Sequence, residues 1–253
     1  MNKLPLNINL TIIVPSFNEE LNLELTIKTI ITDAQKYLSS FEVIIVDDGS
    51  TDNTQKIALH IKNNYANIYL VTHKKNLGLG AAILSGVKVA RYNLITYLPA
   101  DGQAYLRDII NGLQIAQNAD LVLTYRLRRS DYTALRKLLS LSLTILMRIF
   151  FGLRYKDYNW VHIYKKHIFS KIEISTKSVF FLGEIVIKAH QQRMKIAEVE
   201  SVYRPRRSGV SKTAKFRIVS IAFLDLLRVW YSLYIGKILH NAKKIFGKWM
   251  VQI

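Results

Sequence analysis

The stretch Phe41-Glu-Val-Ile-Ile-Val-Asp-Asp-Gly-Ser-Thr-Asp-Asn-Thr54 decides the fold, because an apolar run stops in it at two carboxylates and a turn. Residues 43–46 are all β-branched and show no polar alternation, which predicts a strand buried on both faces of a sheet. The two aspartates therefore lie at the carboxyl end of that strand, where Ser50 or Thr51 can cap a following helix. Ligands bind at this edge in open parallel sheets.

Strand-like and helix-like segments alternate on both sides of this stretch. The strand-like runs are 10–14, 43–46, 68–71 and 94–98, and the helical segments between them are 19–36, 52–64 and 78–91. Strands that alternate with helices at this spacing predict an α/β fold, in which a mostly parallel sheet carries helices on both faces.

The second half of the chain continues less regularly. Its expected elements are a helix at 105–117, a strand at 121–124, helices at 135–151 and 182–191, a strand at 196–202 and helices over 216–236 and 237–253. The helices at 135–151 and 216–253 are apolar but interrupted by charges, and none contains the uncharged run that a membrane span needs. We expect them to be amphipathic helices at a membrane interface, with membrane spanning or oligomer contacts as alternatives.

Composition limits the kind of protein. The chain has 253 residues, of which 50% are hydrophobic, so it can bury a sizeable core. It contains no cysteine, which excludes disulfides, thiolate zinc sites and cysteine nucleophiles and fits a reducing, cytosolic setting. Lys3 is the one charged residue before the first strand and no long apolar region precedes residue 11, so we expect no signal peptide.

The net charge of +18 is concentrated in the second half. Residues 1–100 contain nine Lys and Arg against eight Asp and Glu, whereas residues 101–253 contain twenty-seven against ten. The second half therefore faces something anionic. Nucleic acid, an anionic membrane surface and a phosphorylated substrate all satisfy this charge, and charge alone does not choose among them.

Four separated pieces of sequence come together at one edge of the predicted sheet. They are Val14-Pro-Ser-Phe-Asn-Glu19, Val46-Asp-Asp-Gly-Ser-Thr-Asp52, Asn76-Leu-Gly-Leu-Gly80 and Leu98-Pro-Ala-Asp-Gly-Gln103. In this order they resemble the nucleotide-sugar domain of the inverting glycosyltransferases of family 2, and this resemblance implies a Rossmann-like GT-A fold. The glycines of the third piece do not fit a nicotinamide enzyme, and no P-loop is present.

The resemblance implies a donor site and a metal. Asp47 would read the base or ribose of the nucleotide, and the residues implied for donor binding are Pro15, Asn18, Glu19, Asp47, Asp48, Lys74 and Gly78. Asp101 and Gln103 would hold Mg²⁺ or Mn²⁺, because a hard divalent cation on oxygen ligands neutralises a diphosphate as the sugar leaves. Pro99 stands where the family's metal loop usually has its first aspartate.

The second half resembles the polyprenyl-phosphate branch of the family, typified by dolichyl-phosphate mannose synthases. The residues implied for the acceptor phosphate are Arg126, Arg136, Ser140, Arg206, Ser211 and Lys212, and catalysis is implied for Asp101, Arg126, Arg136 and Arg206. Chemistry agrees, because a lipid phosphate is already an anion and needs cations, whereas a hydroxyl acceptor needs a carboxylate base. We expect Glu184 to order the arginines.

The predicted function is transfer of a hexose from a UDP- or GDP-sugar to a polyprenyl phosphate. The catalytic domain would cover 1–215, divided into a nucleotide-sugar half at 1–103 and an acceptor half at 104–215, and 216–253 would bind the membrane. We expect a peripheral protein on the cytoplasmic face of a membrane, with an anionic membrane surface as partner and no nucleic acid. The alternatives are transfer to a saccharide or protein hydroxyl, and a basic binding module without catalysis.

Overall fold

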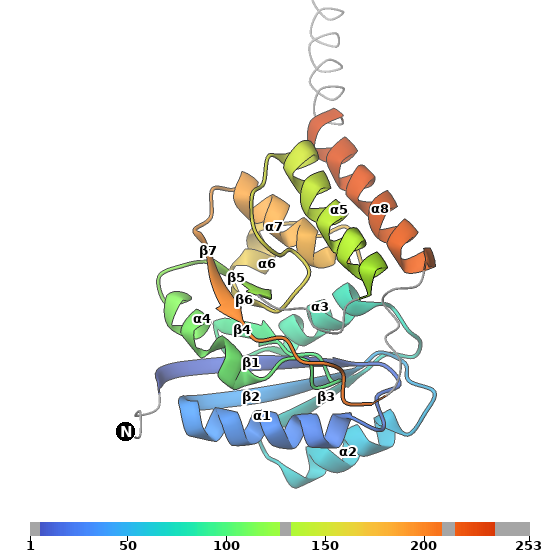
Figure 1. Ribbon diagram of the computed structural model, residues 1–253. Helices are drawn as coiled ribbons and strands as arrows, with labels where there is room; N and C mark the ends of the chain where they lie inside the picture. The colour runs from blue at the N-terminus through green and yellow to red at the C-terminus, as the bar shows by residue number, and fades with distance from the viewer. Residues whose placement is uncertain (1–5, 127–132, 209–215, 236–253) are drawn as a thin grey trace, which may run out of the picture.

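The computed structural model describes residues 6–126, 133–208 and 216–235, apart from the side chains of residues 135, 136 and 216–218. Within these residues, seven strands form one sheet in the order β3-β2-β1-β4-β6-β5-β7 (Figure 1). The strands are β1 (Leu6–Ser16), β2 (Leu38–Asp47), β3 (Ile68–Thr72), β4 (Leu94–Tyr97), β5 (Leu121–Arg126), β6 (His162–Lys165) and β7 (Ile196–Ser201).

The sheet is mostly parallel, as the sequence predicts. β1 pairs with β2 and β4, β2 with β3, and β5 with β7, all in parallel register. The exception is β6, which the sequence analysis did not predict and which runs antiparallel between β4 and β5. It covers only four residues, and such a short strand gives little period-2 signal.

The helices of the described residues match the expected segments, with one addition. They are α1 (Leu23–Tyr37), α2 (Thr54–Asn64), α3 (Leu79–Val89), the 3₁₀ turn η1 (Leu106–Ile109), α4 (Ile110–Ile115), α5 (Ala134–Phe151), α6 (Ile168–Lys171), α7 (Phe181–Gln191), α8 (Phe216–Trp230) and a π-helical turn η2 (Tyr231–Ile235). The sequence analysis did not predict α6, which is a single turn.

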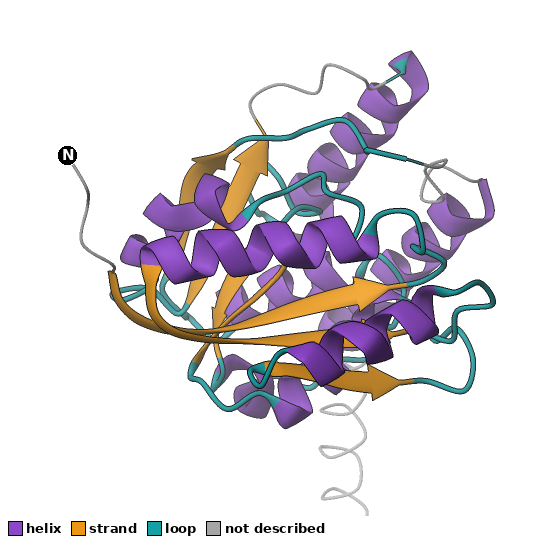
Figure 2. Cartoon of the chain, turned by 90° about the horizontal axis from the view of Figure 1, so that it is seen from below, coloured by secondary structure: helices purple, strands orange, loops and turns teal. Residues whose placement is uncertain are grey.

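Two hydrophobic cores lie on opposite faces of the sheet, and Figure 2 shows helices on both sides of it. One core joins Ile12 of β1 to α1, α2, η1 and α4. The other joins Ile13 of β1 to α3, α5, α6, α7 and α8. Adjacent strand residues point to opposite faces, so a continuous apolar strand serves both cores. The predicted α/β fold with helices on both faces is confirmed.

Gly86 sets how closely α3 approaches β1. A Cβ atom built on this residue would lie 2.7 Å from Cγ2 of Ile13, a separation that real side chains do not adopt. The absence of a side chain at Gly86 therefore lets α3 pack directly on the strand whose carboxyl end carries the first loop of the candidate site.

The expected cap of α2 is wrong. The helix begins at Thr54, and its N-cap residue, Asn53, makes no side-chain capping bond. Ser50 and Thr51 hydrogen-bond instead to Asn18, which lies in the loop after β1. The hydroxyl groups of Ser50 and Thr51, which we expected to cap α2, therefore bind Asn18 in the loop after β1 instead.

Helices α5 and α8 lie side by side at the end of the molecule away from β3 (Figure 1). Both present large apolar side chains to solvent. Those exposed on α5 are Leu138, Leu141, Ile145 and Ile149, and those on α8 are Ile221, Phe223 and Leu224. Among the described residues, no helix has the length and apolar character needed to cross a membrane.

Candidate active site

A cavity of about 350 Å³ opens at the carboxyl ends of β1, β2 and β4. The four pieces of sequence singled out above all contribute to it, together with two arginines from the second half of the chain. The lining residues include Pro15, Ser16, Phe17, Glu19, Asp48, Asn76, Gly78, Leu79, Tyr97, Pro99, Asp101, Gln103, Arg126, Asn159, Trp160, Val179 and Arg206. The predicted convergence of these pieces at one sheet edge is therefore found in the fold.

The loop after β1 is held by the loop after β2. Asn18 has a positive φ of 53°, a conformation that asparagine tolerates better than most residues. Its Oδ1 accepts the backbone N–H of Thr51 at 2.8 Å, and its own N–H donates to Oγ of Ser50 at 3.0 Å. The backbone N–H of Glu19 donates to Oγ1 of Thr54 at 2.7 Å. Asn18 thus orders the loop that brings Glu19 to the cavity.

Asp48 organises the turn that opposes this loop. Its carboxylate accepts the backbone N–H groups of Leu77 at 2.9 Å and Gly78 at 2.8 Å. Nδ1 of His73 lies 2.6 Å from the same carboxylate, and Nε2 of that ring lies 2.9 Å from Oγ of Ser85 on α3. Asp48 therefore fixes the residues that lead into α3.

Asp47 and Lys74 do not line this cavity, although the sequence analysis placed them in one pocket with Pro15 and Glu19. They line a neighbouring hollow together with Gly49, Ser50, Thr51, Gln55, Thr72 and His73. Successive residues at the end of a strand point to opposite sides. Asp47 and Asp48 are therefore adjacent in sequence but face different spaces.

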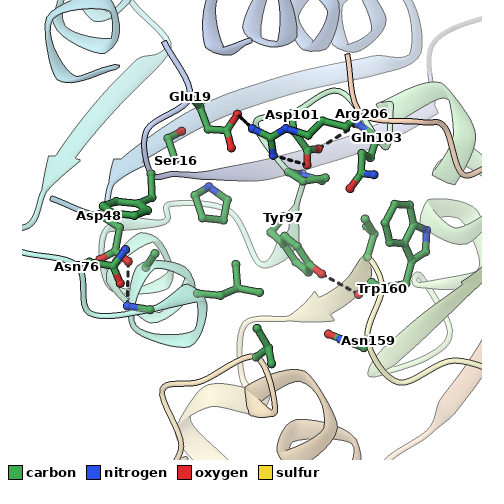
Figure 3. A pocket seen from close by; sticks show the side chains of 18 of the residues that line it. Ser16, Glu19, Asp48, Asn76, Tyr97, Asp101, Gln103, Asn159, Trp160 and Arg206 are labelled. Carbon is green, nitrogen blue, oxygen red and sulfur yellow. Dashed lines mark hydrogen bonds and ion pairs between the residues drawn. The ribbon is translucent and has the colours of Figure 1, made fainter. Parts of the chain in front are cut away.

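Arg206 connects two carboxylates from different loops. Its Nη2 lies 2.5 Å from Oε2 of Glu19 and its Nη1 lies 3.2 Å from Oδ2 of Asp101. Figure 3 shows this group on one side of the cavity, with Asp48 and Asn76 on another side and Tyr97 between them. Burial raises the pKa of the Asp101 carboxyl, and the nearby Arg206 only partly opposes this shift.

The site fits a cation that arrives with phosphate groups. The side chains that line the cavity carry the positive charges of Arg126 and Arg206 against the negative charges of Glu19, Asp48 and Asp101, a formal balance of −1. A nucleotide diphosphate therefore needs a counter-charge there. The described residues contain no cluster of three or more acidic or imidazole groups able to hold a metal alone, and Mg²⁺ characteristically binds one or two carboxylates together with substrate phosphates.

Gln103 lies beside Asp101 in the same loop. Its backbone N–H donates to Oδ1 of Asp101 at 3.2 Å, and its Nε2 donates to the hydroxyl of Tyr203 at 2.9 Å. The bond to Tyr203 orients the side-chain amide. Asp101 and Gln103, the two predicted metal ligands, thus lie together at the cavity wall.

Arg126 is a buried member of an ion pair. Its side chain is 6% exposed and donates to both carboxylate oxygens of Asp157, at 2.7 and 2.9 Å. The guanidinium carbon of Arg126 lies 4.7 Å from the ring centre of Trp160. Its Nη2 donates a hydrogen bond to the carbonyl of Asn159. Such two-point pairing gives a fixed orientation. Arg126 therefore presents an oriented, partly neutralised charge.

The remaining acceptor predictions have different outcomes. Ser140 lies on α5 and is not among the residues that line the cavity. Ser211, Lys212 and the side chain of Arg136 lie outside the described residues. Glu184 does not order the arginines as expected, because its carboxylate is taken by residues 175–176 and by Lys188.

Several lining residues were missed by the sequence analysis, among them Tyr97, Trp160 and Val179. Tyr97 ends β4, and its hydroxyl donates to the carbonyl of Trp160 at 2.8 Å. Trp160 lies shortly before β6, in a segment to which the sequence analysis assigned no site residue. Val179 belongs to the segment before α7, and nothing in its sequence marks it as a pocket residue.

Comparison with known proteins supports this fold. The model of the family described as "Glycosyl transferase family 2" matches residues 11–171. An undecaprenyl-phosphate 4-deoxy-4-formamido-L-arabinose transferase from Pectobacterium atrosepticum is 28% identical over 223 residues, which is 87% of this chain and 66% of the relative. A dodecaprenyl-phosphate galacturonate synthase from Rhizobium johnstonii is 28% identical over 89% of this chain and 67% of its own.

Two further proteins extend the comparison. A dolichyl-phosphate beta-glucosyltransferase from Trichomonas vaginalis is 32% identical over 160 residues, or 56% of this chain and 48% of that protein. The chain therefore spans about half to two thirds of the length of these relatives. The glucosyl-3-phosphoglycerate synthase of Mycobacterium tuberculosis, solved with Mn²⁺ and UDP, aligns with a TM-score of 0.67 and 15% identity over 88% of this chain and 79% of that one. The likeness of this solved structure supports the GT-A fold. Because the family model matches residues 11–171, which is more than half of the chain, the chain belongs to glycosyl transferase family 2.

Proposed function

We propose that this protein transfers one sugar from a nucleotide-sugar to a polyprenyl phosphate, with inversion at the transferred carbon. The observation that carries the proposal is that one cavity joins the donor loops to Arg126 and Arg206 from the acceptor half. The three relatives described above are named for transfer to undecaprenyl, dodecaprenyl or dolichyl phosphate, and this supports the same acceptor class here.

The donor would occupy two adjoining spaces. The hollow lined by Asp47 and Lys74 would receive the base or ribose, since a carboxylate accepts N–H and O–H groups and a lysine supplies a cation. The diphosphate would extend past Gly78 into the main cavity. Pro15, Asn18, Glu19 and Asp48 would shape that path, Asn18 and Asp48 by ordering the loops rather than by direct contact.

Asp101 and Gln103 would hold Mg²⁺ or Mn²⁺ carried by the donor. The metal, when bound, supplies positive charge to the leaving diphosphate. Arg206 would separate from Asp101 as that carboxylate takes up the cation, and its guanidinium would then face the phosphate groups. Because the pairing of Arg206 with Asp101 is 3.2 Å long whereas that with Glu19 is 2.5 Å, the contact with Asp101 is the weaker of the two.

The acceptor would be an anion rather than a hydroxyl group. Among the described residues, every carboxylate that lines the cavity already accepts a hydrogen bond or ion pair: Glu19 and Asp101 from Arg206, and Asp48 from backbone N–H groups. A hydroxyl acceptor needs a carboxylate able to take its proton. A phosphate oxygen attacks without losing a proton, which favours the lipid phosphate over a saccharide or protein hydroxyl.

Cations would orient the acceptor phosphate for attack on the sugar. Arg126 and Arg206 supply them within the cavity. We retain Arg136 and Lys212 as further cations, and Ser140 and Ser211 as hydroxyl donors to the same phosphate, although Ser140 does not line the described cavity. Guanidinium groups bind phosphate through two parallel hydrogen bonds. The catalytic residues we propose are therefore Asp101, Arg126, Arg136 and Arg206.

The lipid would reach the cavity from a membrane surface. Helices α5 and α8 lie side by side and expose apolar side chains. The second half of the chain carries most of the excess positive charge. Apolar residues toward the acyl boundary and cations toward anionic headgroups hold a peripheral protein on a bilayer. We place the protein on the cytoplasmic face, with residues 216–253 as the membrane-associating part.

The test of the proposed reaction is a transfer assay. The protein is incubated with Mn²⁺ or Mg²⁺, a panel of UDP- and GDP-sugars, and undecaprenyl or dolichyl phosphate. We expect a glycolipid whose sugar is linked through phosphate, and loss of product when metal is chelated. Absence of transfer and of nucleotide binding across the panel would refute the proposal, and transfer to a saccharide without lipid phosphate would favour the hydroxyl-acceptor alternative.

The membrane association is tested separately with liposomes. We expect the protein to float with vesicles that contain anionic lipid and to be released by high salt. Deletion of residues 237–253 should weaken flotation while UDP or GDP binding persists. A protein that ignores anionic vesicles would contradict the membrane proposal, and one that only detergent extracts would contradict peripheral association.

A further inference from the structure

Glu184 is a buried carboxylate that the proposed reaction does not use. It lies in α7 with a fully buried side chain. Its Oε1 accepts the backbone N–H and the hydroxyl of Ser175 at 2.9 and 2.6 Å. Its Oε2 accepts the same two groups of Thr176 at 2.8 and 2.7 Å. Nζ of Lys188 lies 2.6 Å from Oε1.

These contacts keep Glu184 ionised and occupied. Burial alone would raise the pKa of its carboxyl, but the hydrogen bonds from Lys188, Ser175 and Thr176 together hold that pKa below its ordinary value. A carboxylate that accepts four hydrogen bonds and an ion pair has no oxygen left to take a proton from a substrate. Glu184 is therefore not a general base.

The two residues that Glu184 binds begin a segment that reaches the donor cavity. The carbonyl of Lys177 accepts the backbone N–H of Gly80 at 3.2 Å. The same carbonyl would lie 2.7 Å from a Cβ atom on Gly78, so this backbone packs directly on the turn. Two residues farther on, Val179 lines the cavity. Phe181 packs against Gly80, where a Cβ atom would lie 2.8 Å from its side chain.

The turn at Gly78–Gly80 is thus held from two sides. Asp48 binds the N–H of Gly78 on one side, and residues 177–181 contact the turn on the other. Asp48 directly follows β2, and its backbone N–H donates to the carbonyl of Ser16 at 2.8 Å. The opposite segment contains no described helix or strand between Lys171 and Phe181, so Glu184 supplies the side-chain anchor that fixes it.

We propose that Glu184 is a positioning residue for the nucleotide-sugar donor. It holds residues 175–179 against the Gly78–Gly80 turn and thereby sets one wall of the donor cavity. The identity of the ligand rests on the proposed function, whereas the coupling of Glu184 to the turn rests on the contacts alone. A carboxylate on α7 would then govern donor affinity without touching the donor.

Glu42 provides a matched control. It too is a buried glutamate, 1% exposed, and it accepts hydrogen bonds from the hydroxyl of Thr11 at 2.7 Å and from Arg91 at 2.6 and 2.9 Å. Hydrogen bonds outweigh burial and lower its pKa as they do for Glu184. It is not among the residues that line either hollow. Glu42→Gln therefore removes a buried charge, as Glu184→Gln does, but leaves the contacts of residues 175–179 with the Gly78–Gly80 turn in place.

The experiment compares Glu184→Gln with Glu42→Gln in the full chain. Glutamine keeps the volume but directs an NH₂ group at N–H and O–H donors, which breaks part of each network. Calorimetric titration with UDP and GDP in the presence of Mn²⁺ should show binding weakened roughly tenfold for Glu184→Gln and less than about twofold for Glu42→Gln. In the transfer assay, KM for the donor should rise more than kcat falls.

Hydrogen exchange tests the same coupling without any nucleotide. Residues 78–82 should exchange faster in Glu184→Gln than in the wild type, and Glu42→Gln should leave them unchanged. If Glu184→Gln does not fold, Thr176→Val removes one hydroxyl donor with little change of shape and should give a smaller effect in the same direction. Wild-type exchange at 78–82 together with wild-type nucleotide affinity would overturn the inference.

The two possible failures are distinguishable. A wild-type protein that binds neither UDP nor GDP and transfers no sugar would refute the proposed function, and the donor would then no longer be what Glu184 positions. A wild-type protein that binds nucleotide, with both glutamine variants binding equally well, would refute only the role of Glu184.

Discussion

The stability of this protein should depend on pH through His162. This residue lies on β6 with a fully buried side chain, and neither ring nitrogen has a hydrogen-bond partner among the described residues. Its ring centre lies 5.8 Å from that of Tyr164, whose hydroxyl also lacks a partner there. Burial above all lowers the pKa of His162 to about 3; the negative charge of Asp157 opposes this shift, and the positive charge of Arg126 adds to it.

The size of the effect follows from the difference between the folded and unfolded pKa values. The ordinary value is 6.5, so the unfolded chain binds a proton at His162 as the pH falls below that value, while the folded chain stays neutral until about pH 3. Proton binding by the unfolded state lowers the free energy of unfolding across this window. At pH 5 the loss relative to pH 7 is about 2 kcal/mol, or a shift of roughly 4 to 8 °C in Tm for a chain of this size.

The assay compares wild type with His162→Leu. Urea unfolding at pH 7 and pH 5 gives the change in free energy of unfolding for each protein, and the difference between the two changes removes the contribution of the carboxyl groups that both share. We expect the variant to lose about 2 kcal/mol less than wild type between these pH values. His60→Leu, at an exposed position on α2, supplies a control for the effect of replacing a histidine by leucine at the surface. Equal pH dependence in wild type and His162→Leu would refute the reasoning.

Three further substitutions test the packing, the buried ion pair and the metal. Gly86→Ala places a Cβ atom 2.7 Å from Ile13 and should lower the free energy of unfolding by about 1 to 3 kcal/mol. An unchanged midpoint of urea unfolding would contradict this prediction. Asp157→Asn leaves the guanidinium of Arg126 buried without a full counter-charge. We expect the free energy of unfolding to fall by about 3 kcal/mol and kcat/KM for the lipid phosphate to decrease. Wild-type values of both would disprove that Asp157 supports Arg126. Asp101→Asn should abolish the gain in UDP affinity that Mn²⁺ provides, while the affinity without metal is retained. Calorimetry with and without Mn²⁺ measures this gain, and a gain that persists in the variant would show that Asp101 does not bind the metal.

The sequence by itself determined the alternation of strands and helices and the edge at which the four loops meet. These features follow from local rules. β-branched runs favour strands, the 3.6-residue period favours helices, and parallel strands bring their carboxyl ends to one edge. The order of Asp48, Asp101 and their loops along the chain was therefore enough to predict that they meet at one edge, and both residues line the cavity there. Their assignment to a donor came from the resemblance to family 2.

Strand β6 shows where local rules stop. Its four residues lie between Val161 and Lys166, and nothing in their own period distinguishes them from a loop. The strand forms because β4 and β5 each offer an unpaired edge, which β6 fills in antiparallel register. That pairing depends on the tertiary arrangement of segments far apart in sequence.

The chemical state of the site was likewise decided only by tertiary structure. Arg206 meets Glu19 across 187 residues of sequence, and Arg126 meets Asp157 across 31. Sequence showed that these side chains carry charge, but whether a charge is free or paired depends on which groups the fold brings within hydrogen-bond distance. Glu184 is the clearest case, because we expected it to order the arginines, whereas the fold pairs its carboxylate with Ser175 and Thr176.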